Sequence, residues 1–200
     1  MKHLHYLAVA ALALSTSAFA QSTPAADTAP DTAGLIGKRY AETTLNYTDR
    51  KTTQKDLFGP AVKFNLPINS NFDLAASYSH SLQQRWVNVN DYAGVTGLAY
   101  FTQDEFKPFV SLALGYVWGP VAVDRSVYTF SGGFEYAATE KLALTFGVNI
   151  DDDFKSHTPA AYSGFGKASY SFSKRFTGSV TVTILKAGSR AFGVSLAYKF

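Results

Sequence analysis

The feature that most constrains the fold is an alternation of apolar residues with small or polar ones, which recurs from residue 36 to the end of the chain. Its last instance, AFGVSLAYKF at 191–200, places an apolar residue at every second position, namely Phe192, Val194, Leu196, Tyr198 and Phe200. Successive side chains of a strand point to opposite faces, so this alternation predicts strands. Helical periodicity is not sustained in this region, and an all-β fold follows.

Ten such segments, separated by turn residues, predict strands at 38–49, 57–67, 71–83, 88–101, 107–118, 126–137, 141–151, 160–172, 176–186 and 190–200. An even number of strands is typical of closed antiparallel barrels in bacterial membranes. The segment 88–101 is apolar in mixed registers, which indicates a β-bulge or a wrong boundary. If it is not a strand, an eight-stranded barrel is the alternative.

The apolar faces of these segments are rich in Tyr and Phe, and their alternate positions hold small or polar residues. Beyond the first twenty residues, no segment approaches the ~18 consecutive apolar residues of a transmembrane helix. We therefore expect a transmembrane antiparallel up-and-down β-barrel, with apolar faces toward lipid and polar faces toward the lumen. A soluble all-β fold is the alternative, but it would have to bury all of these faces in one dry core.

The first twenty residues, MKHLHYLAVAALALSTSAFA, combine a basic start, a short apolar run and small residues before Ala20. This pattern predicts a signal peptide at 1–20 that is cleaved after Ala20. Residues 21–35 are mostly Pro, Ala, Thr and Asp and predict a disordered periplasmic leader, followed by the barrel at 36–200. The chain has no cysteine, which excludes disulfides and thiolate chemistry, and its net charge of +3 argues against a nucleic-acid partner.

The signal peptide, the wholly β chain and the terminal GVSLAYKF together resemble the small outer-membrane β-barrels of Gram-negative bacteria, the opacity-protein and porin-like group. The resemblance covers residues 36–200. It implies a location in the bacterial outer membrane, with lipid and lipopolysaccharide as surroundings and no cofactor. It also implies that the barrel-assembly machinery reads the terminal pattern, which consists here of Val194, Leu196, Tyr198 and Phe200. The oligomeric state is left open.

The same alternation points six ionisable side chains inward, three acids and three bases: Glu42, Lys63, Asp73, Glu135, Lys167 and Lys199. The interior of a small barrel is nearly filled by side chains, and an unpaired buried charge costs several kcal/mol. We therefore expect these charges to pair into a network that plugs the lumen of a non-catalytic envelope or surface protein. A narrow porin-like diffusion channel for small solutes is the alternative.

A barrel enzyme acting on lipid or peptide is a third possibility, which would need a histidine within reach of a nucleophile or water. The two candidates, His80 and His157, match no catalytic motif, so we predict no catalytic residue. The acids at 151–153 are contiguous and lack the spacing of a calcium loop, so no metal site is predicted. Six basic residues at the outer rim are expected to contact lipopolysaccharide phosphates: Arg50, Lys51, Lys55, Arg85, Lys186 and Arg190.

Overall fold

The structure is a computed structural model, and it describes residues 34–50, 56–83, 87–120, 124–154 and 160–200. All of them belong to one compact unit, Asp31–Phe200. Several expectations fall outside the described residues: the signal peptide at 1–20, the leader at 21–33, His157, and the basic residues Lys51, Lys55 and Arg85.

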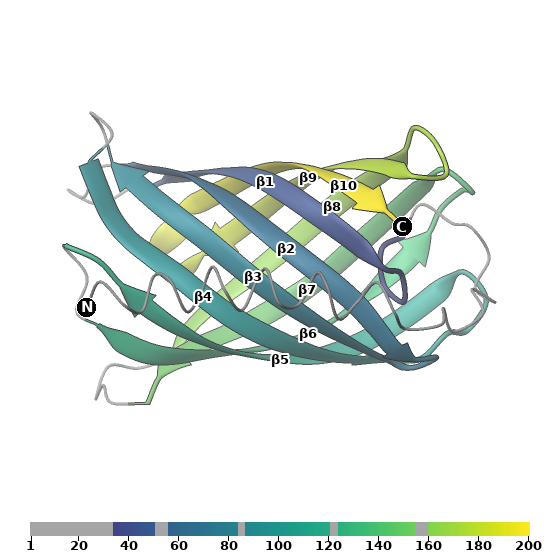
Figure 1. Cartoon of the computed structure of the whole chain (residues 1–200), viewed down its shortest axis with the longest axis horizontal. Helices are drawn as coiled ribbons and strands as arrows, with labels where there is room; N and C mark the ends of the chain where they lie inside the picture. Colours follow the sequence, from purple (N-terminus) through teal and green to yellow (C-terminus); the bar gives the residue numbers. More distant parts are fainter. Residues whose placement is uncertain (1–33, 51–55, 84–86, 121–123, 155–159) are drawn as a thin grey trace. The chain divides into compact units, whose positions relative to one another are not determined.

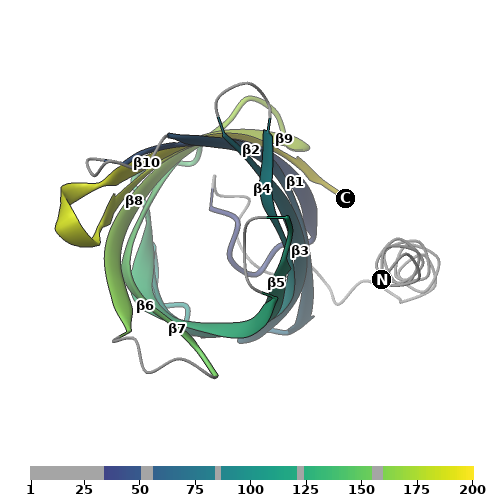
Figure 2. The same ribbon diagram turned by 90° about the vertical axis from the view of Figure 1, so that its left-hand side faces the viewer.

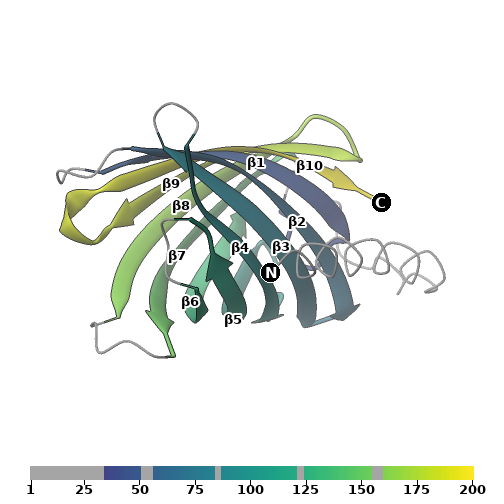
Figure 3. The same ribbon diagram turned by 60° about the vertical axis from the view of Figure 1, so that its left-hand side comes forward.

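Within the described residues, ten strands form a closed antiparallel barrel in which each strand pairs with its neighbours in sequence and β1 pairs with β10 (Figures 1 and 2). The strands are β1 (Tyr40–Asp49), β2 (Leu57–Asn69), β3 (Phe72–Gln83), β4 (Val87–Tyr100), β5 (Phe106–Trp118), β6 (Arg125–Ala137), β7 (Leu142–Asp153), β8 (Ala161–Ser171), β9 (Phe176–Leu185) and β10 (Arg190–Lys199). They run obliquely around the barrel (Figure 3). The predicted ten-stranded barrel is confirmed, and the eight-stranded alternative is wrong.

The segment with mixed registers is a strand, β4, and it contains the expected irregularity. Its pairing with β3 shifts between Ser81 and Leu82, where Ser81 lies opposite Asn90 and Leu82 opposite Asn88. Such a bulge adds one residue to a strand and changes which residues share a face. Asn88 and Asp91, three positions apart, therefore both have partners on the outward face of β3.

The two ends of the barrel differ in their connections. Residues 70–71, 101–105, 138–141 and 172–175 join strands at one end, which we call the short-turn end, and the C-terminus lies there too (Figure 1). The opposite end, which we call the loop end, carries the connections between β1 and β2, β3 and β4, β5 and β6, β7 and β8, and β9 and β10. The last of these contains a short 3₁₀ helix, η1 (Lys186–Gly188). Among the described residues we find no helix both long and apolar enough to cross a membrane.

The outer surface of the barrel is covered by large apolar side chains. Val148, Ile184 and Val194 are each exposed by 61 to 62 %. Aromatic side chains pack together near both ends, as Phe176 does with Tyr198 at the short-turn end, with ring centroids 5.2 Å apart. A continuous apolar surface between two aromatic girdles is the surface of a transmembrane barrel, which faces lipid.

The lumen also holds large aromatic rings, which the alternation of small polar residues does not predict. The ring of Tyr92 lies against Gly94 on its own strand and Gly115 on β5, and the ring of Phe165 lies against Gly147 on β7. A Cβ atom added at Gly147 would stand 2.7 Å from the Phe165 ring. Inward glycines on the wall thus leave the room that these rings occupy.

Candidate functional site in the lumen

The six residues before the first strand, Gly34–Arg39, lie within the ring of strands (Figure 2), and we call them the luminal segment. Leu35 and Ile36 are only 5 and 8 % exposed. The last two residues of the expected leader at 21–35, Gly34 and Leu35, are buried against the barrel wall. They are buried because Leu35 and Ile36 form an apolar pair that packs onto apolar groups inside the lumen.

One side of the luminal segment is bound by charged side chains of β5 and β6. The amide of Leu35 donates to Oε2 of Glu135 at 3.0 Å. The ammonium of Lys107 donates to the carbonyl oxygen of Ile36 at 3.1 Å. Lys107 and Glu135 lie opposite each other in the pairing of the two strands, and both are buried. A carboxylate and an ammonium thus each bind one backbone group of the segment.

The next residues of the segment are bound by β2 and β3. The amide of Gly37 donates to Oδ2 of Asp73 at 2.9 Å. The side-chain amide of Asn65 donates to the carbonyl oxygen of Lys38 at 2.8 Å and to Oδ2 of Asp73 at 2.9 Å. The segment then continues into β1. Because β1 and β6 are five strands apart in a closed ring of ten, the segment joins opposite sides of the barrel.

Apolar contacts accompany these hydrogen bonds. Ile36 belongs to a buried cluster with Tyr100 of β4 and Phe109 of β5, against which Leu98 and Phe165 pack. Leu35 belongs to a second cluster with Tyr40 of β1 and Ala197 of β10. The luminal segment therefore contacts both halves of the barrel through side chains as well as through its backbone.

Two glycines fit the luminal segment to this wall. Gly37 has a φ of +81°, a conformation that L side chains rarely adopt, and a Cβ atom there would stand 2.7 Å from the hydroxyl oxygen of Tyr100. A Cβ atom at Gly34 would collide with the carboxylate of Glu135. The spacing of these glycines around the Leu35–Ile36 pair is the sequence signal that could have revealed the segment.

A second group of charges lies deeper in the lumen. Nζ of Lys167 is 2.7 Å from Oε1 of Glu42, and the hydroxyl of Ser195 donates to the same oxygen at 2.6 Å. Lys63 lies opposite Glu42 in the pairing of β1 and β2, with its Nζ 5.9 Å from the centre of the Tyr40 ring. These contacts balance the carboxylate of Glu42, which is 6 % exposed.

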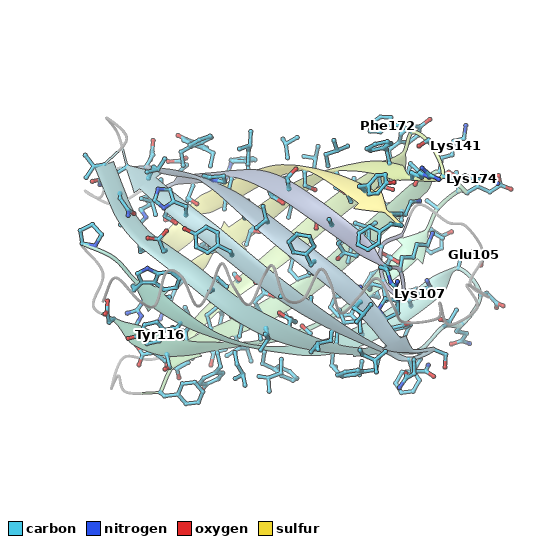
Figure 4. All side chains as sticks on the ribbon, in the orientation of Figure 1. Glu105, Lys107, Tyr116, Lys141, Phe172 and Lys174 are labelled. Atoms are coloured by element: carbon cyan, nitrogen blue, oxygen red, sulfur yellow. The ribbon has the colours of Figure 1, made fainter. Side chains whose placement is uncertain are left out.

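The six inward charges expected from the sequence thus divide into groups. Glu42, Lys63 and Lys167 lie together, whereas Asp73 and Glu135 bind the luminal segment. The ammonium of Lys199 lies 3.4 Å from the hydroxyl of Ser171. Sequence reasoning missed Lys107, although the alternation in β5 places it on the inward face. Lys107 lies toward the same end of the barrel as Glu105, Lys141 and Lys174, and Tyr116 lies toward the other end (Figure 4).

His80 lies on the outward face of β3 and not in the lumen. Its Nδ1 is 2.7 Å from Oδ1 of Asp91, and the hydroxyl of Tyr78 donates to the same oxygen at 2.6 Å. Nδ2 of Asn88 is 3.4 Å from the other carboxylate oxygen. The carboxylate of Asp91 is thus surrounded by donors on the lipid-facing wall, near Trp118, its partner in β5.

The remaining candidate residues lie on the outward face of β10 and at the loop end. Val194, Leu196, Tyr198 and Phe200 all lie exposed on the outward face of β10 or just beyond it. At the loop end, Lys186 and Arg190 are exposed, and the amide of Arg50 donates to Oδ1 of Asp56 at 3.2 Å. In the part of the chain that the structure describes, no three His, Asp or Glu side chains lie together in a way that could hold a metal ion.

Comparison with known proteins finds no matching family profile and no matching curated protein. Among solved structures, similarity is found to the KdgM porin in complex with disordered oligogalacturonate, with 17 % identity, a TM-score of 0.47, and coverage of 82 % of this chain and 98 % of that one. The NanC porin gives 7 % identity, a TM-score of 0.47 and coverage of 80 and 100 %. The N-terminal β-barrel domain of Pseudomonas aeruginosa OprF gives 14 % identity, a TM-score of 0.41, and coverage of 82 % of this chain and 99 % of that one. These similarities are in fold alone.

Proposed function

We propose that this protein is an integral outer-membrane β-barrel, exported by the signal peptide at 1–20, which acts as a non-catalytic envelope protein with a closed lumen. The observation that carries the proposal is the luminal segment, which joins β6 to β1 from inside the barrel. The apolar outer surface supports the membrane location, because side chains such as Val148 and Val194 are exposed all around the wall.

The proposed closure is supported by the groups that lie in the lumen. The luminal segment occupies the short-turn end together with Tyr100 and Phe109. Further along the barrel, the rings of Tyr92 and Phe165 point inward. There too, Nζ of Lys167 lies 2.7 Å from Oε1 of Glu42. The segment and this pair are both held by charge-assisted hydrogen bonds, which supports the proposal that they hinder the passage of ions.

The alternative function is a narrow diffusion channel for small solutes. It is favoured by the wall of β9, where four successive inward residues are small and carry hydroxyls, namely Thr177, Ser179, Thr181 and Thr183. Hydroxyl groups can replace water around a polar solute without a charge barrier. In this alternative the luminal segment is displaced from the lumen in the conducting state.

Single-channel conductance distinguishes the two functions. A chain from Gln21 to Phe200 would be refolded, its folding verified by the mobility difference between heated and unheated samples, and inserted into a planar bilayer. We expect silence from this chain and from a control that begins at Gly34. A chain that begins at Arg39 lacks most of the luminal segment and should give steady conductance steps. Steps from the first chain would reject the closed lumen in favour of the channel.

The C-terminal residues and the rim carry two subsidiary proposals. Val194, Leu196, Tyr198 and Phe200 are proposed to bind the barrel-assembly machinery, which their shared outward face supports. Removal of the Phe200 ring should lower the amount of protein inserted in cells while refolding in vitro proceeds. The basic residues at the loop end, Arg50, Lys51, Lys55, Arg85, Lys186 and Arg190, are proposed to contact lipopolysaccharide.

A further inference from the structure

The lipid-facing wall contains an open groove near the loop end. The groove has a volume of about 520 Å³ and lies where β7, β8 and β9 meet, lined among others by Val148, Ile150, Tyr162, Gly164 and Ile184. Register pairs Val148 with Gly164 and Gly164 with Ile184, so the glycine lies between two large apolar side chains on the same face. The groove is therefore an apolar depression that opens toward lipid.

Gly164 forms the floor of the groove because no side chain of the described residues covers it. The nearest atom to a Cβ added there is the carbonyl oxygen of Gly147, 3.9 Å away. Gly132, opposite Val148 on the other side, is likewise open, whereas Gly166 is covered by the ring of Phe146 at 3.4 Å and Gly97 by the ring of Phe72 at 3.2 Å. The depression at Gly164 is thus left open by the side chains around it.

Basic side chains mark the end of the groove nearer the loops. Lys186 contributes to the lining and is exposed, and Arg190 is exposed opposite Ile184 in the pairing of β9 and β10. Acids also lie on this face: Asp49 is opposite Arg190 in the pairing of β1 and β10, and Asp152, on the far side of β7, accepts a hydrogen bond from the hydroxyl of Tyr128 at 3.3 Å. An apolar groove that ends at two cations matches an amphiphile whose acyl chain adjoins an anionic head group.

We propose that this groove binds one lipopolysaccharide molecule, with an acyl chain over Gly164 and a phosphate at Lys186 and Arg190. The inference rests on the proposed function for its orientation, because the loop end must face the outer leaflet, where phosphorylated glycolipid is the anionic amphiphile. Of the six basic rim residues proposed to contact lipopolysaccharide, the inference assigns two, Lys186 and Arg190, to this site. It adds the apolar groove that would hold the acyl chain. Arg and Lys both bind phosphate through charged donors.

The test measures lipopolysaccharide retained per barrel, by native mass spectrometry of protein extracted from outer membranes in mild detergent. Gly164→Leu fills the groove and should abolish the retained molecule. Ala168→Leu is the matched control, because Ala168 is exposed on the same face of β8, nearer the short-turn end. Lys186→Gln should weaken binding of purified lipopolysaccharide about fivefold, the effect expected for one cation at a membrane surface. Lys174→Gln, which lies in a turn at the short-turn end, should leave the affinity for lipopolysaccharide unchanged.

Three results would overturn the inference. The first is equal retention of lipopolysaccharide by Gly164→Leu and Ala168→Leu, and the second is an equal loss of lipopolysaccharide affinity in Lys186→Gln and Lys174→Gln. The third is a phospholipid retained in place of lipopolysaccharide. Each variant is first shown to be folded by its heat-dependent mobility, so loss of folding is not mistaken for loss of binding. The closed lumen is tested separately by conductance. A barrel that conducts ions can still retain lipopolysaccharide, and a barrel that does not conduct can lack bound lipopolysaccharide. The proposals of a closed lumen and of a lipopolysaccharide groove can therefore fail independently.

Discussion

The backbone amide of Leu35 and the carboxylate of Glu135 are 3.0 Å apart, although 100 residues of chain separate them. This contact explains why an acid that is 4 % exposed is tolerated on the barrel wall. A buried carboxylate is costly unless donors surround it, and the luminal segment supplies one of these donors from its own backbone. The ammonium of Lys107, opposite Glu135 in register, supplies a balancing charge.

Replacement of Gly37 should displace the luminal segment. Gly37→Val introduces a side chain at a φ of +81° and against the hydroxyl of Tyr100, which should cost about 1–3 kcal/mol of unfolding free energy. We expect conductance steps in a planar bilayer and a lower temperature at which the heat-dependent mobility is lost. Gly132→Val is the control, because a Cβ atom at Gly132 has no other atom within 4 Å. A silent and equally stable Gly37→Val barrel would contradict the role given to the segment.

The pair of Lys167 and Glu42 should show strong coupling. Glu42→Leu alone leaves the ammonium of Lys167 in the lumen without its partner at 2.7 Å, which should cost about 3–5 kcal/mol. The double variant Glu42→Leu with Lys167→Met removes both charges and should recover much of that loss. The measurement is reversible urea unfolding in lipid vesicles for all four members of the cycle. Additive effects of the two single changes would show that the pair is not coupled.

The ring of Tyr92 should depend on the absence of a side chain at Gly115. Gly115→Val places a side chain where the Tyr92 ring lies, so unfolding should become easier by about 1–3 kcal/mol. Tyr92→Ala leaves a void, and the combination with Gly115→Val should be more stable than Gly115→Val alone. Urea unfolding tests the rescue. Failure of the second change to recover stability would mean that the two residues do not share that space in the folded barrel.

Asp91 should stabilise the lipid-facing wall through its donors. Asp91→Ala leaves the hydroxyl of Tyr78 and the ring of His80 without their acceptor on an apolar surface, which should lower the unfolding free energy by about 1–3 kcal/mol. Asp124→Ala removes an exposed carboxylate near the same end and serves as the control. Unfolding followed by the fluorescence of Trp118, which lies opposite Asp91, measures both. Equal stability of the two variants would dismiss a structural role for the cluster.

The barrel wall was predictable from sequence because each strand repeats the same alternation, and lipid contact enforces it on every outward face. Ten strands, their turns and the irregularity in β4 follow from that one pattern. The inward charges were predictable for the same reason, since Asp73 lies at an inward position between the apolar Phe72 and Leu74, and Glu42 falls on the inward face of β1.

The luminal segment was not predictable in this way because it is not a strand. Leu35 and Ile36 are too short an apolar run to outweigh the polar composition before them, and their partners are distant in sequence. Alternation predicts which side chains point inward, but it does not predict that Asp73 and Glu135 bind backbone amides rather than the nearest lysine. The aromatic rings in the lumen escaped notice because their space is created by glycines on neighbouring strands.

The way in which the luminal segment is bound also fixes the order of events as the protein matures. Its partners lie on β2, β3, β5 and β6, and its apolar contacts include Ala197 of β10. This binding surface exists in full only after β1 has paired with β10, so docking of the segment is complete only in the closed ring. If the segment closes the lumen as proposed, a barrel whose ring is complete but whose segment has not yet docked is still accessible to ions.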